Sequence, residues 1–89
     1  MRIDYSHQFI KHLRKAPKKI QLALRYRLEL FLKDPRNPQL RIHSLQGKYR
    51  DYKSLNITGD WRALYRELKE DKEIIYFFEM LGTHSQLYK

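Results

Sequence analysis

The sequence predicts an α+β domain in which an N-terminal helical hairpin packs on a mainly antiparallel, twisted sheet. Three observations predict this fold: an apolar stripe at helical spacing between residues 17 and 33, strand-like runs after residue 48, and short turn segments between those runs. The predicted element order is β-α-α-β-β-β. The 89 residues are enough for one hydrophobic core, so residues 1–89 are expected to form a single domain.

The N-terminal elements follow from local signals. Residues 2–5 alternate in polarity and predict a short strand. Ser6 suits the N-cap of a first helix, and Pro17 suits the first position of a second helix. The second helix is expected to end at Asp34-Pro35, because a proline drives the preceding residue out of the helical conformation. The expected apolar faces comprise Phe9, Leu13 and Ala16 in the first helix, and Ile20, Leu24, Leu28 and Phe31, widened by Ala23 and Leu32, in the second.

Three strand-like runs follow, at residues 49–57, 61–69 and 73–81. They are separated by the short links 58–60 and 70–72, which suit antiparallel hairpins. Neither face of the middle run is purely apolar: Arg62, Leu64, Arg66 and Leu68 alternate with Trp61, Ala63, Tyr65 and Glu67. We therefore expect part of the sheet to meet the helices and the remainder, with its arginines, to face a ligand.

Composition excludes several classes of protein. There is no cysteine, which excludes a disulfide scaffold, a thiolate zinc site and cysteine catalysis. The longest apolar run, residues 74–78, is too short to span a membrane, and the first residues lack the apolar core of a secretion signal. We expect a cytoplasmic protein with no membrane partner.

The charge is strongly basic and unevenly distributed. The net charge is +9, with 13 basic and 3 acidic side chains in residues 1–50 against 6 and 7 in residues 51–89. Such asymmetry favours a polyanionic partner, because cations that displace counterions from phosphates gain affinity. A surface that serves only solubility remains the alternative.

No common enzyme motif is present. The three glycines are scattered and cannot form a phosphate-binding loop, and the four histidines lack metal-ligand spacing, so no metal or small-molecule cofactor is expected. Imidazoles with neighbouring cations could instead cleave a phosphodiester, by moving the 2′-hydroxyl proton and stabilising charge on phosphorus. Each candidate also has a structural interpretation; Asp60, for example, stands where a hairpin turn favours aspartate. The polar candidates are His43, Lys53, Asp60, Arg62, His84 and the aromatic Tyr88, which could stack on an unpaired base.

The whole chain resembles the RelE/YafQ-type toxins of bacterial type II toxin–antitoxin systems. The resemblance lies in the segments DYSHQFIKHLRKAPKKI, HSLQGKYRDYKSLNI, GDWRALYRE and, above all, LGTHSQLY. It implies a RelE-like microbial ribonuclease fold and a ribosome-dependent mRNA endoribonuclease (an mRNA interferase) that inhibits translation. It also implies three partners: the ribosome, mRNA and a cognate antitoxin.

The resemblance further implies roles for particular residues. His43, Asp60 and His84 match catalytic positions of YafQ-like members, and Tyr88 matches a terminal aromatic. Asn56 stands where those members have another histidine, which leaves one proton-transfer position in doubt. Lys53 and Arg62 match basic positions of RelE-like members, but Leu55 stands where those members have a second lysine. We expect His84 to shuttle a proton with Asp60 or His43 as its counterpart, Arg62 and Lys53 to neutralise the phosphate, and Tyr88 to hold the base or sugar.

The cations of the predicted helices have no obvious catalytic use and are assigned to docking on ribosomal RNA. They are Lys18, Lys19, Arg25 and Arg27, together with Lys11, Arg14 and Lys15. Two other functions remain open from the sequence. One is a gyrase poison of the ParE-like type, which shares the fold, and the other is a nucleic-acid-binding module without catalysis.

Overall fold

The computed structural model describes residues 2–88. The strands are β1 (Arg2–Tyr5), β2 (His43–Ser44), β3 (Lys53–Asn56), β4 (Trp61–Glu70) and β5 (Glu73–Thr83). The helices are α1 (His7–Lys15), α2 (Lys18–Lys33) and α3 (His84–Leu87), with two single 3-10 turns, η1 (Pro38–Leu40) and η2 (Gly47–Tyr49). No helix within residues 2–88 is long and apolar enough to cross a membrane.

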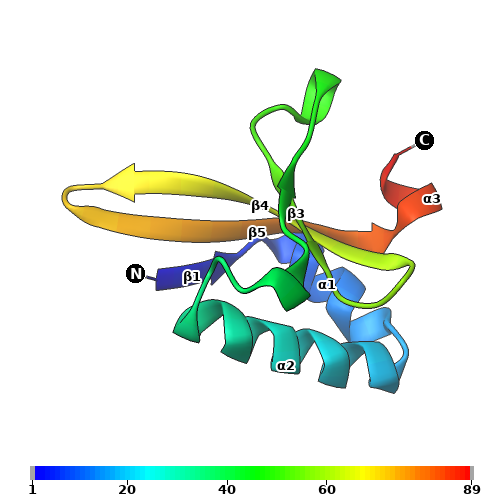
Figure 1. The fold of residues 1–89 in the computed structure, drawn as a ribbon. Helices are drawn as coiled ribbons and strands as arrows, with labels where there is room; N and C mark the ends of the chain where they lie inside the picture. Colours follow the sequence, from blue (N-terminus) through cyan, green and yellow to red (C-terminus); the bar gives the residue numbers. More distant parts are fainter. Residues whose placement is uncertain (1, 89) are drawn as a thin grey trace.

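The five strands form one sheet in the order β1-β5-β4-β3-β2. β1 runs parallel to β5, and the other neighbours are antiparallel, so the predicted mainly antiparallel α+β fold is confirmed. β4 and β5 form a long hairpin that extends beyond the other strands, while the loop around η2 rises from the sheet near the last helix (Figure 1).

Helices α1 and α2 cover one face of the sheet and close the hydrophobic core. The Ser6 side chain accepts a hydrogen bond from the Phe9 amide at 2.9 Å, which confirms Ser6 as the N-cap of α1. α2 ends before Pro35 as predicted, but Pro17 is its N-cap rather than its first residue, and Leu32 is half exposed rather than part of the buried stripe. The core joins Phe9, Ala16, Ile20, Leu24 and Phe31 of the helical region to Leu55, Ile57, Ala63, Tyr65, Tyr76, Phe78 and Leu81 of the sheet region.

A β-bulge at Glu79 determines which side chains of β5 face the helices. Leu64 pairs with Met80 but Tyr65 pairs with Phe78, so Glu79 is the extra residue. The bulge shifts the alternation by one residue, and Leu81 joins Phe78 in the core. The opposite face, which α1 and α2 leave uncovered, carries Arg62 and Arg66, as the alternation predicts.

The structure corrects the first predicted run of strand and adds strand β2 and helix α3, besides the 3-10 turns η1 and η2. Residues 49–57 are not one strand: Tyr49 belongs to η2, and only Lys53–Asn56 form β3. The two-residue β2 pairs with β3 at the edge of the sheet, a long-range contact that residues 43–44 do not signal locally. β5 continues to Thr83, and the chain then turns into α3.

Candidate active site

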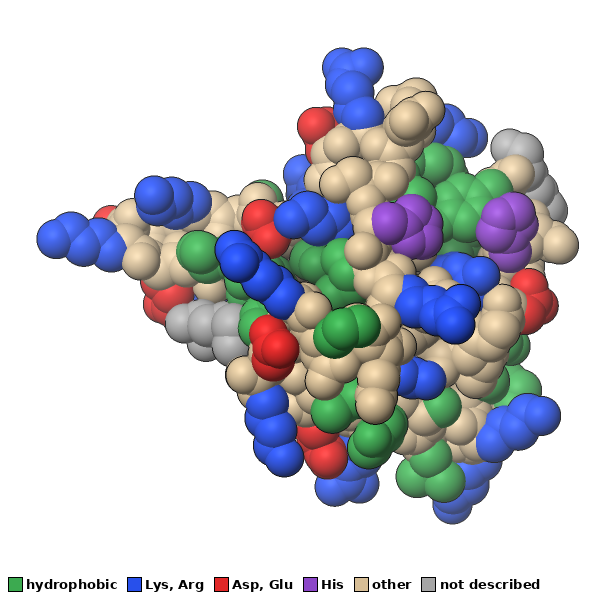
Figure 2. Space-filling model, in the orientation of Figure 1, with side chains coloured by type: hydrophobic (Ala, Val, Ile, Leu, Met, Phe, Trp, Pro, Cys, Tyr) green, Lys and Arg blue, Asp and Glu red, His purple; other side chains and the backbone are tan. Residues whose placement is uncertain are grey.

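Three separate segments of the chain supply the walls of one hollow at the edge of the sheet. His43 comes from β2, Arg62 from β4, and His84 and Tyr88 from the C-terminal turn; Leu45 completes the lining. The hollow is open and has a volume of about 330 Å³. Figure 2 shows two histidine side chains on this face, on either side of a hydrophobic patch and above basic side chains.

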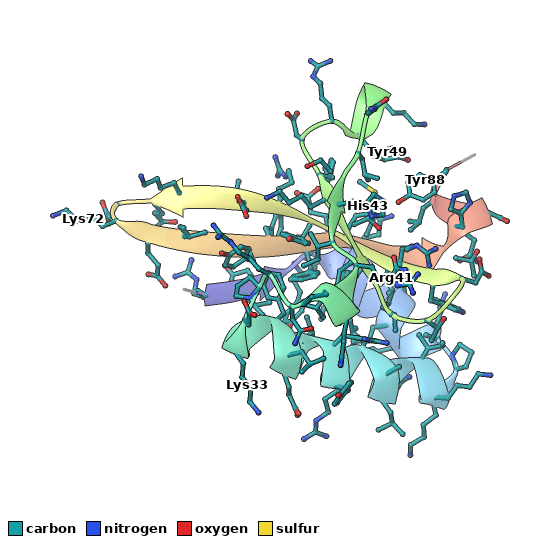
Figure 3. The ribbon with its side chains drawn as sticks, in the orientation of Figure 1. Lys33, Arg41, His43, Tyr49, Lys72 and Tyr88 are labelled. Atoms are coloured by element: carbon teal, nitrogen blue, oxygen red, sulfur yellow. The ribbon has the colours of Figure 1, made fainter. Side chains whose placement is uncertain are left out.

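The His43 side chain is exposed, and its ring contacts the backbone of the same segment. Its Nδ1 lies 3.1 Å from the carbonyl oxygen of Arg41, two residues earlier. Figure 3 shows His43 beside β3, with Tyr88 across from it and Arg41 just beneath.

Arg62 is half-buried and fixed by two backbone carbonyls. One guanidinium nitrogen, Nη1, donates to the carbonyls of Thr58 at 3.1 Å and Trp61 at 3.2 Å. The positive charge is therefore oriented before any ligand arrives, and it faces no carboxylate among the residues that line the hollow. A fixed guanidinium beside two imidazoles can neutralise a phosphate while protons move.

Helix α3 places His84 and Tyr88 by means of a capping box. The Thr83 side chain accepts from the Gln86 amide at 3.3 Å, and the Gln86 side chain accepts from the Thr83 amide at 2.9 Å. The rings of His84 and Tyr88 meet edge to face with centroids 4.7 Å apart. Tyr88 also lies 3.5 Å, hydroxyl to hydroxyl, from the buried Ser54, which connects the terminal turn to β3.

Asp60 supports the hollow without lining it. Its backbone carbonyl accepts a hydrogen bond of 3.0 Å from the His84 amide, while the residue itself is exposed. Asn56 pairs with Arg62 across β3 and β4, and its side-chain oxygen is buried without a hydrogen-bond partner in residues 2–88. Neither residue belongs to the lining.

Lys53 lies on the other face of the sheet, which separates it from the expected phosphate site. It pairs with Tyr65, whose side chain is in the helix-covered core, and its ammonium forms an ion pair of 3.3 Å with Glu67. The expected grouping of Lys53 with Arg62 is wrong. Lys53 shares its face with Tyr65, and Arg62 lies three residues before Tyr65 on β4, an odd spacing that points the two side chains to opposite faces of the sheet.

Among the helix cations, Arg27 is hydrogen-bonded to backbone carbonyls outside its own helix. Arg27 donates hydrogen bonds to the carbonyls of Gln39 at 2.9 Å and Ile57 at 3.4 Å. These bonds connect α2 to η1 and to the residue that follows β3. Lys18, Lys19 and Arg25 are exposed, and Arg25 forms only a loose pair of 3.8 Å with Glu29.

Beside the hollow, the uncovered face carries a second polar cluster. The Glu79 carboxylate accepts hydrogen bonds from Arg66 and from the Tyr52 hydroxyl, and the Arg66 guanidinium lies 5.7 Å from the centre of the Tyr52 ring. The hydrogen bond to Glu79, with burial, raises the pKa of the Tyr52 phenol. Among residues 2–88 no three His, Asp or Glu side chains gather as metal ligands would.

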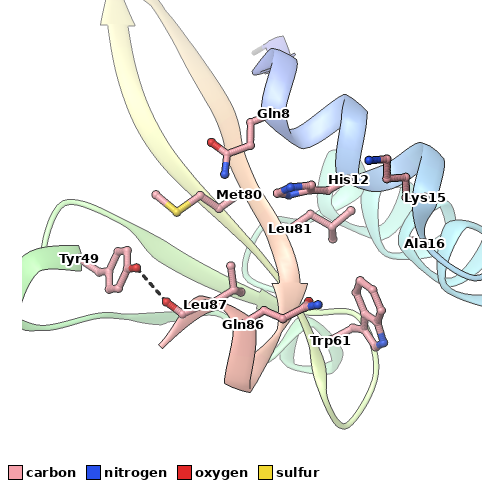
Figure 4. Close-up of a pocket in the computed structure, with 10 residues that line it drawn as sticks. All are labelled: Gln8, His12, Lys15, Ala16, Tyr49, Trp61, Met80, Leu81, Gln86 and Leu87. Atoms are coloured by element: carbon pink, nitrogen blue, oxygen red, sulfur yellow. Dashed lines mark hydrogen bonds between the residues drawn. The ribbon is translucent and has the colours of Figure 1, made fainter. Parts of the chain in front are cut away.

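Two further residues that the sequence did not single out hold the site together. Tyr49 donates a hydrogen bond of 2.8 Å to the carbonyl of Leu87, and Figure 4 shows this bond at the rim of a separate cavity of about 450 Å³ between α1, β5 and α3. Thr83 could have been found from the sequence, since Thr-His-Ser-Gln is a capping-box pattern. The contact of Tyr49 depends on distant pairing and leaves no local signal.

Comparison with known proteins gives consistent results over the full chain. The family model described as "Bacterial toxin of type II toxin-antitoxin system, YafQ" matches residues 1–89. The mRNA interferase toxin YafQ of Escherichia coli strain K12 is 31% identical over 90 residues, covering 97% of this chain and 94% of that protein.

Two solved structures agree with this match. The crystal structure of YafQ from E. coli strain BL21(DE3) is 28% identical with a TM-score of 0.78, covering 98% of this chain and 97% of that one. A chain of the E. coli DinJ-YafQ toxin-antitoxin complex is 30% identical with a TM-score of 0.73, covering 98% and 96%. The resemblance identified from the sequence motifs is thus confirmed, and the chain belongs to the YafQ family of bacterial type II toxins.

Proposed function

We propose that this chain is the toxin of a type II toxin–antitoxin pair and acts in the cytoplasm as an endoribonuclease that cuts mRNA on the ribosome and so inhibits translation. The observation that carries the proposal is that His43, Arg62 and His84 line one hollow although they come from three distant segments. The similarity to a protein named mRNA interferase toxin supports the same activity.

The proposed reaction uses only acid–base chemistry. One imidazole takes the proton of the 2′-hydroxyl, and the 2′-oxygen forms a bond to phosphorus. The bond from phosphorus to the 5′-oxygen breaks, and the second imidazole gives that oxygen a proton. The products are a 2′,3′-cyclic phosphate and a 5′-hydroxyl. Arg62 neutralises the charge that develops on the phosphate oxygens, and Tyr88 stacks on the base or holds the sugar.

The surface charge and the family support the proposed partners. The exposed cations of α1 and α2 suit the phosphates of ribosomal RNA, and such contacts orient a protein on RNA without taking part in the chemistry. A net charge of +9 also suits an acidic antitoxin segment that becomes ordered when it wraps the toxin. The E. coli DinJ-YafQ structure is a toxin-antitoxin complex of a related protein, which supports an antitoxin as the partner.

The test is to map the 5′ ends of mRNA after brief induction of the wild type, His84→Ala and His7→Ala. His7 is the matched control, because it is an exposed histidine on α1 outside the hollow. We expect discrete cuts in translated transcripts with the wild type and His7→Ala and none with His84→Ala. Growth arrest without new 5′ ends would overturn the proposal, and inhibition of gyrase supercoiling in that case would identify a gyrase poison.

A further inference from the structure

The outer half of β4 has a free hydrogen-bonding edge. β3 pairs only with the first half of β4, so residues 66–70 have β5 on one side and no other strand of the described chain on the other. The Ile57 amide donates to the Trp61 carbonyl at 2.9 Å, so the odd-numbered residues of β4 direct their backbone groups away from β5. The N–H and C=O groups of Glu67 and Lys69 therefore point outward, and no hydrogen bond within the described chain uses them.

This edge is open to another strand. Residues 67–70 are exposed, Leu68 to 38%, and neither proline nor glycine interrupts the strand. Figure 1 shows this end of the hairpin standing clear of β3. Unpaired backbone groups along an exposed strand are a template on which a further strand can pair. The sheet can therefore be extended at this edge.

The side chains of this edge are complementary to themselves. When two copies pair antiparallel about Leu68, each Glu67 stands opposite the partner's Lys69, and Arg66 stands opposite the partner's Glu70. A pairing centred on Glu67 or on Lys69 would instead set that charge against its own copy. The charge pattern thus selects one register. In that register Glu67 and Lys69 exchange backbone hydrogen bonds in two symmetric pairs, with a contact between the two leucines in the middle.

The local charge allows two copies to meet here although the whole chain is strongly basic. Residues 66–73 carry three basic and four acidic side chains, while the chain has a net charge of +9. At physiological ionic strength, exposed charges more than about 8 Å apart are largely screened from one another. The edge also lies at the opposite end of β4 from Trp61, which pairs with Thr83 just before α3. Pairing at the free edge would leave the hollow uncovered.

We propose that two copies of this chain associate through the free edges of β4. The strands run antiparallel about a two-fold axis at Leu68, and the sheet continues from one copy into the other. The interface is small, since it consists of the backbone hydrogen bonds, one leucine contact and the flanking charge pairs. The dimer is therefore weak and reversible, and its population depends on protein concentration.

Sedimentation equilibrium of the full-length chain, from about 10 μM to about 1 mM, measures this association. We expect a monomer–dimer equilibrium for the wild type. The dissociation constant of Lys69→Glu should be at least about tenfold higher, because two glutamates then face each other in both symmetric pairs. Lys72→Glu is the matched control, since it makes the same change of charge in the hairpin turn, outside the pairing. An equal mixture of Lys69→Glu and Glu67→Lys should associate again, because the mixed pair restores opposite charges.

Amide hydrogen exchange identifies the edge itself. At high protein concentration the amides of Glu67 and Lys69 should exchange more slowly, while the amide of Leu68, which is directed to β5, should not change. A wild type that stays monomeric throughout would overturn the proposal and leave the edge to a strand of another protein. Equal association of Lys69→Glu and Lys72→Glu would also overturn it, as would a dimer in which the Glu67 and Lys69 amides stay unprotected.

Discussion

The hydroxyl of Tyr49 donates a hydrogen bond of 2.8 Å to the backbone carbonyl of Leu87, 38 residues later in the chain. The Tyr49 ring also meets the ring of Tyr88 edge to face at 5.9 Å. The loop after β2, which leads away from His43, is thus tied to the short helix that carries His84. One hydrogen bond connects the two imidazole-bearing segments of the hollow.

Tyr49→Phe is expected to loosen this connection while keeping the ring. The loss of one hydrogen bond at a partly buried site should lower the free energy of unfolding by only about 1 kcal/mol. Cutting should fall more strongly, by about tenfold, because the two imidazoles would no longer be held at a fixed spacing. Single-turnover cleavage and chemical denaturation measure the two effects. Tyr26→Phe is the control, since Tyr26 is 54% exposed on α2; equal cleavage by both variants would contradict the coupling.

Arg62→Lys is expected to lower cleavage about 100-fold although the charge is kept. A lysine ammonium cannot reproduce the planar guanidinium that donates to the carbonyls of Thr58 and Trp61. The matched control is Arg66→Lys on the same face of the sheet, since Arg66 binds Glu79 and does not line the hollow. The cleavage rate constant of bound mRNA is the measurement. A similar loss in both variants would mean that Arg62 has no special position.

Arg27→Ala and Arg25→Ala are expected to differ in stability. Arg27 loses two hydrogen bonds to backbone carbonyls, and its removal should lower the free energy of unfolding by about 1–2 kcal/mol. Arg25 loses an exposed pair of 3.8 Å with Glu29, which should change stability by less than about 0.5 kcal/mol. Urea denaturation of both variants tests this difference. Equal stability would mean that Arg27 does not fasten α2 to the sheet.

Tyr52→Phe is expected to change how stability depends on pH in alkaline solution. The hydrogen bond to Glu79 raises the pKa of Tyr52 in the folded state, so the folded chain holds this proton more tightly than the unfolded chain. The contribution is fully present below the ordinary tyrosine range, about pH 10, and is lost as the pH rises through the folded value. Wild type should therefore exceed Tyr52→Phe by about 1 kcal/mol at neutral pH, with the gap closing above pH 10. A gap that stays constant into strong alkali would contradict this.

The helices and the two hairpins were predictable because their signals are local. The cap at Ser6, the stop before Pro35 and the short links between strands each act within a few residues. The sequence also singled out His43, Arg62, His84 and Tyr88, although chain order alone could not show that they line one hollow.

The incorrect expectations concern sheet register and long-range contacts. The face occupied by Lys53 depends on its pairing with Tyr65, and a register differing by one residue would reverse it. The bulge at Glu79 and the two-residue β2 form only when distant segments meet. The same holds for the contact between Tyr49 and Leu87, so the sequence could name the polar residues of the site but not what supports them.

The central claim is that the hollow between β2, β4 and α3 is a ribonuclease site. The most direct measurement is single-turnover cleavage of mRNA in purified translating ribosomes, with chemical analysis of the product ends, for the wild type, His43→Ala and His84→Ala. We predict a 2′,3′-cyclic phosphate and a 5′-hydroxyl from the wild type, and at least about 100-fold slower cutting by each variant with ribosome binding retained. Cutting at the wild-type rate by both variants would contradict the account.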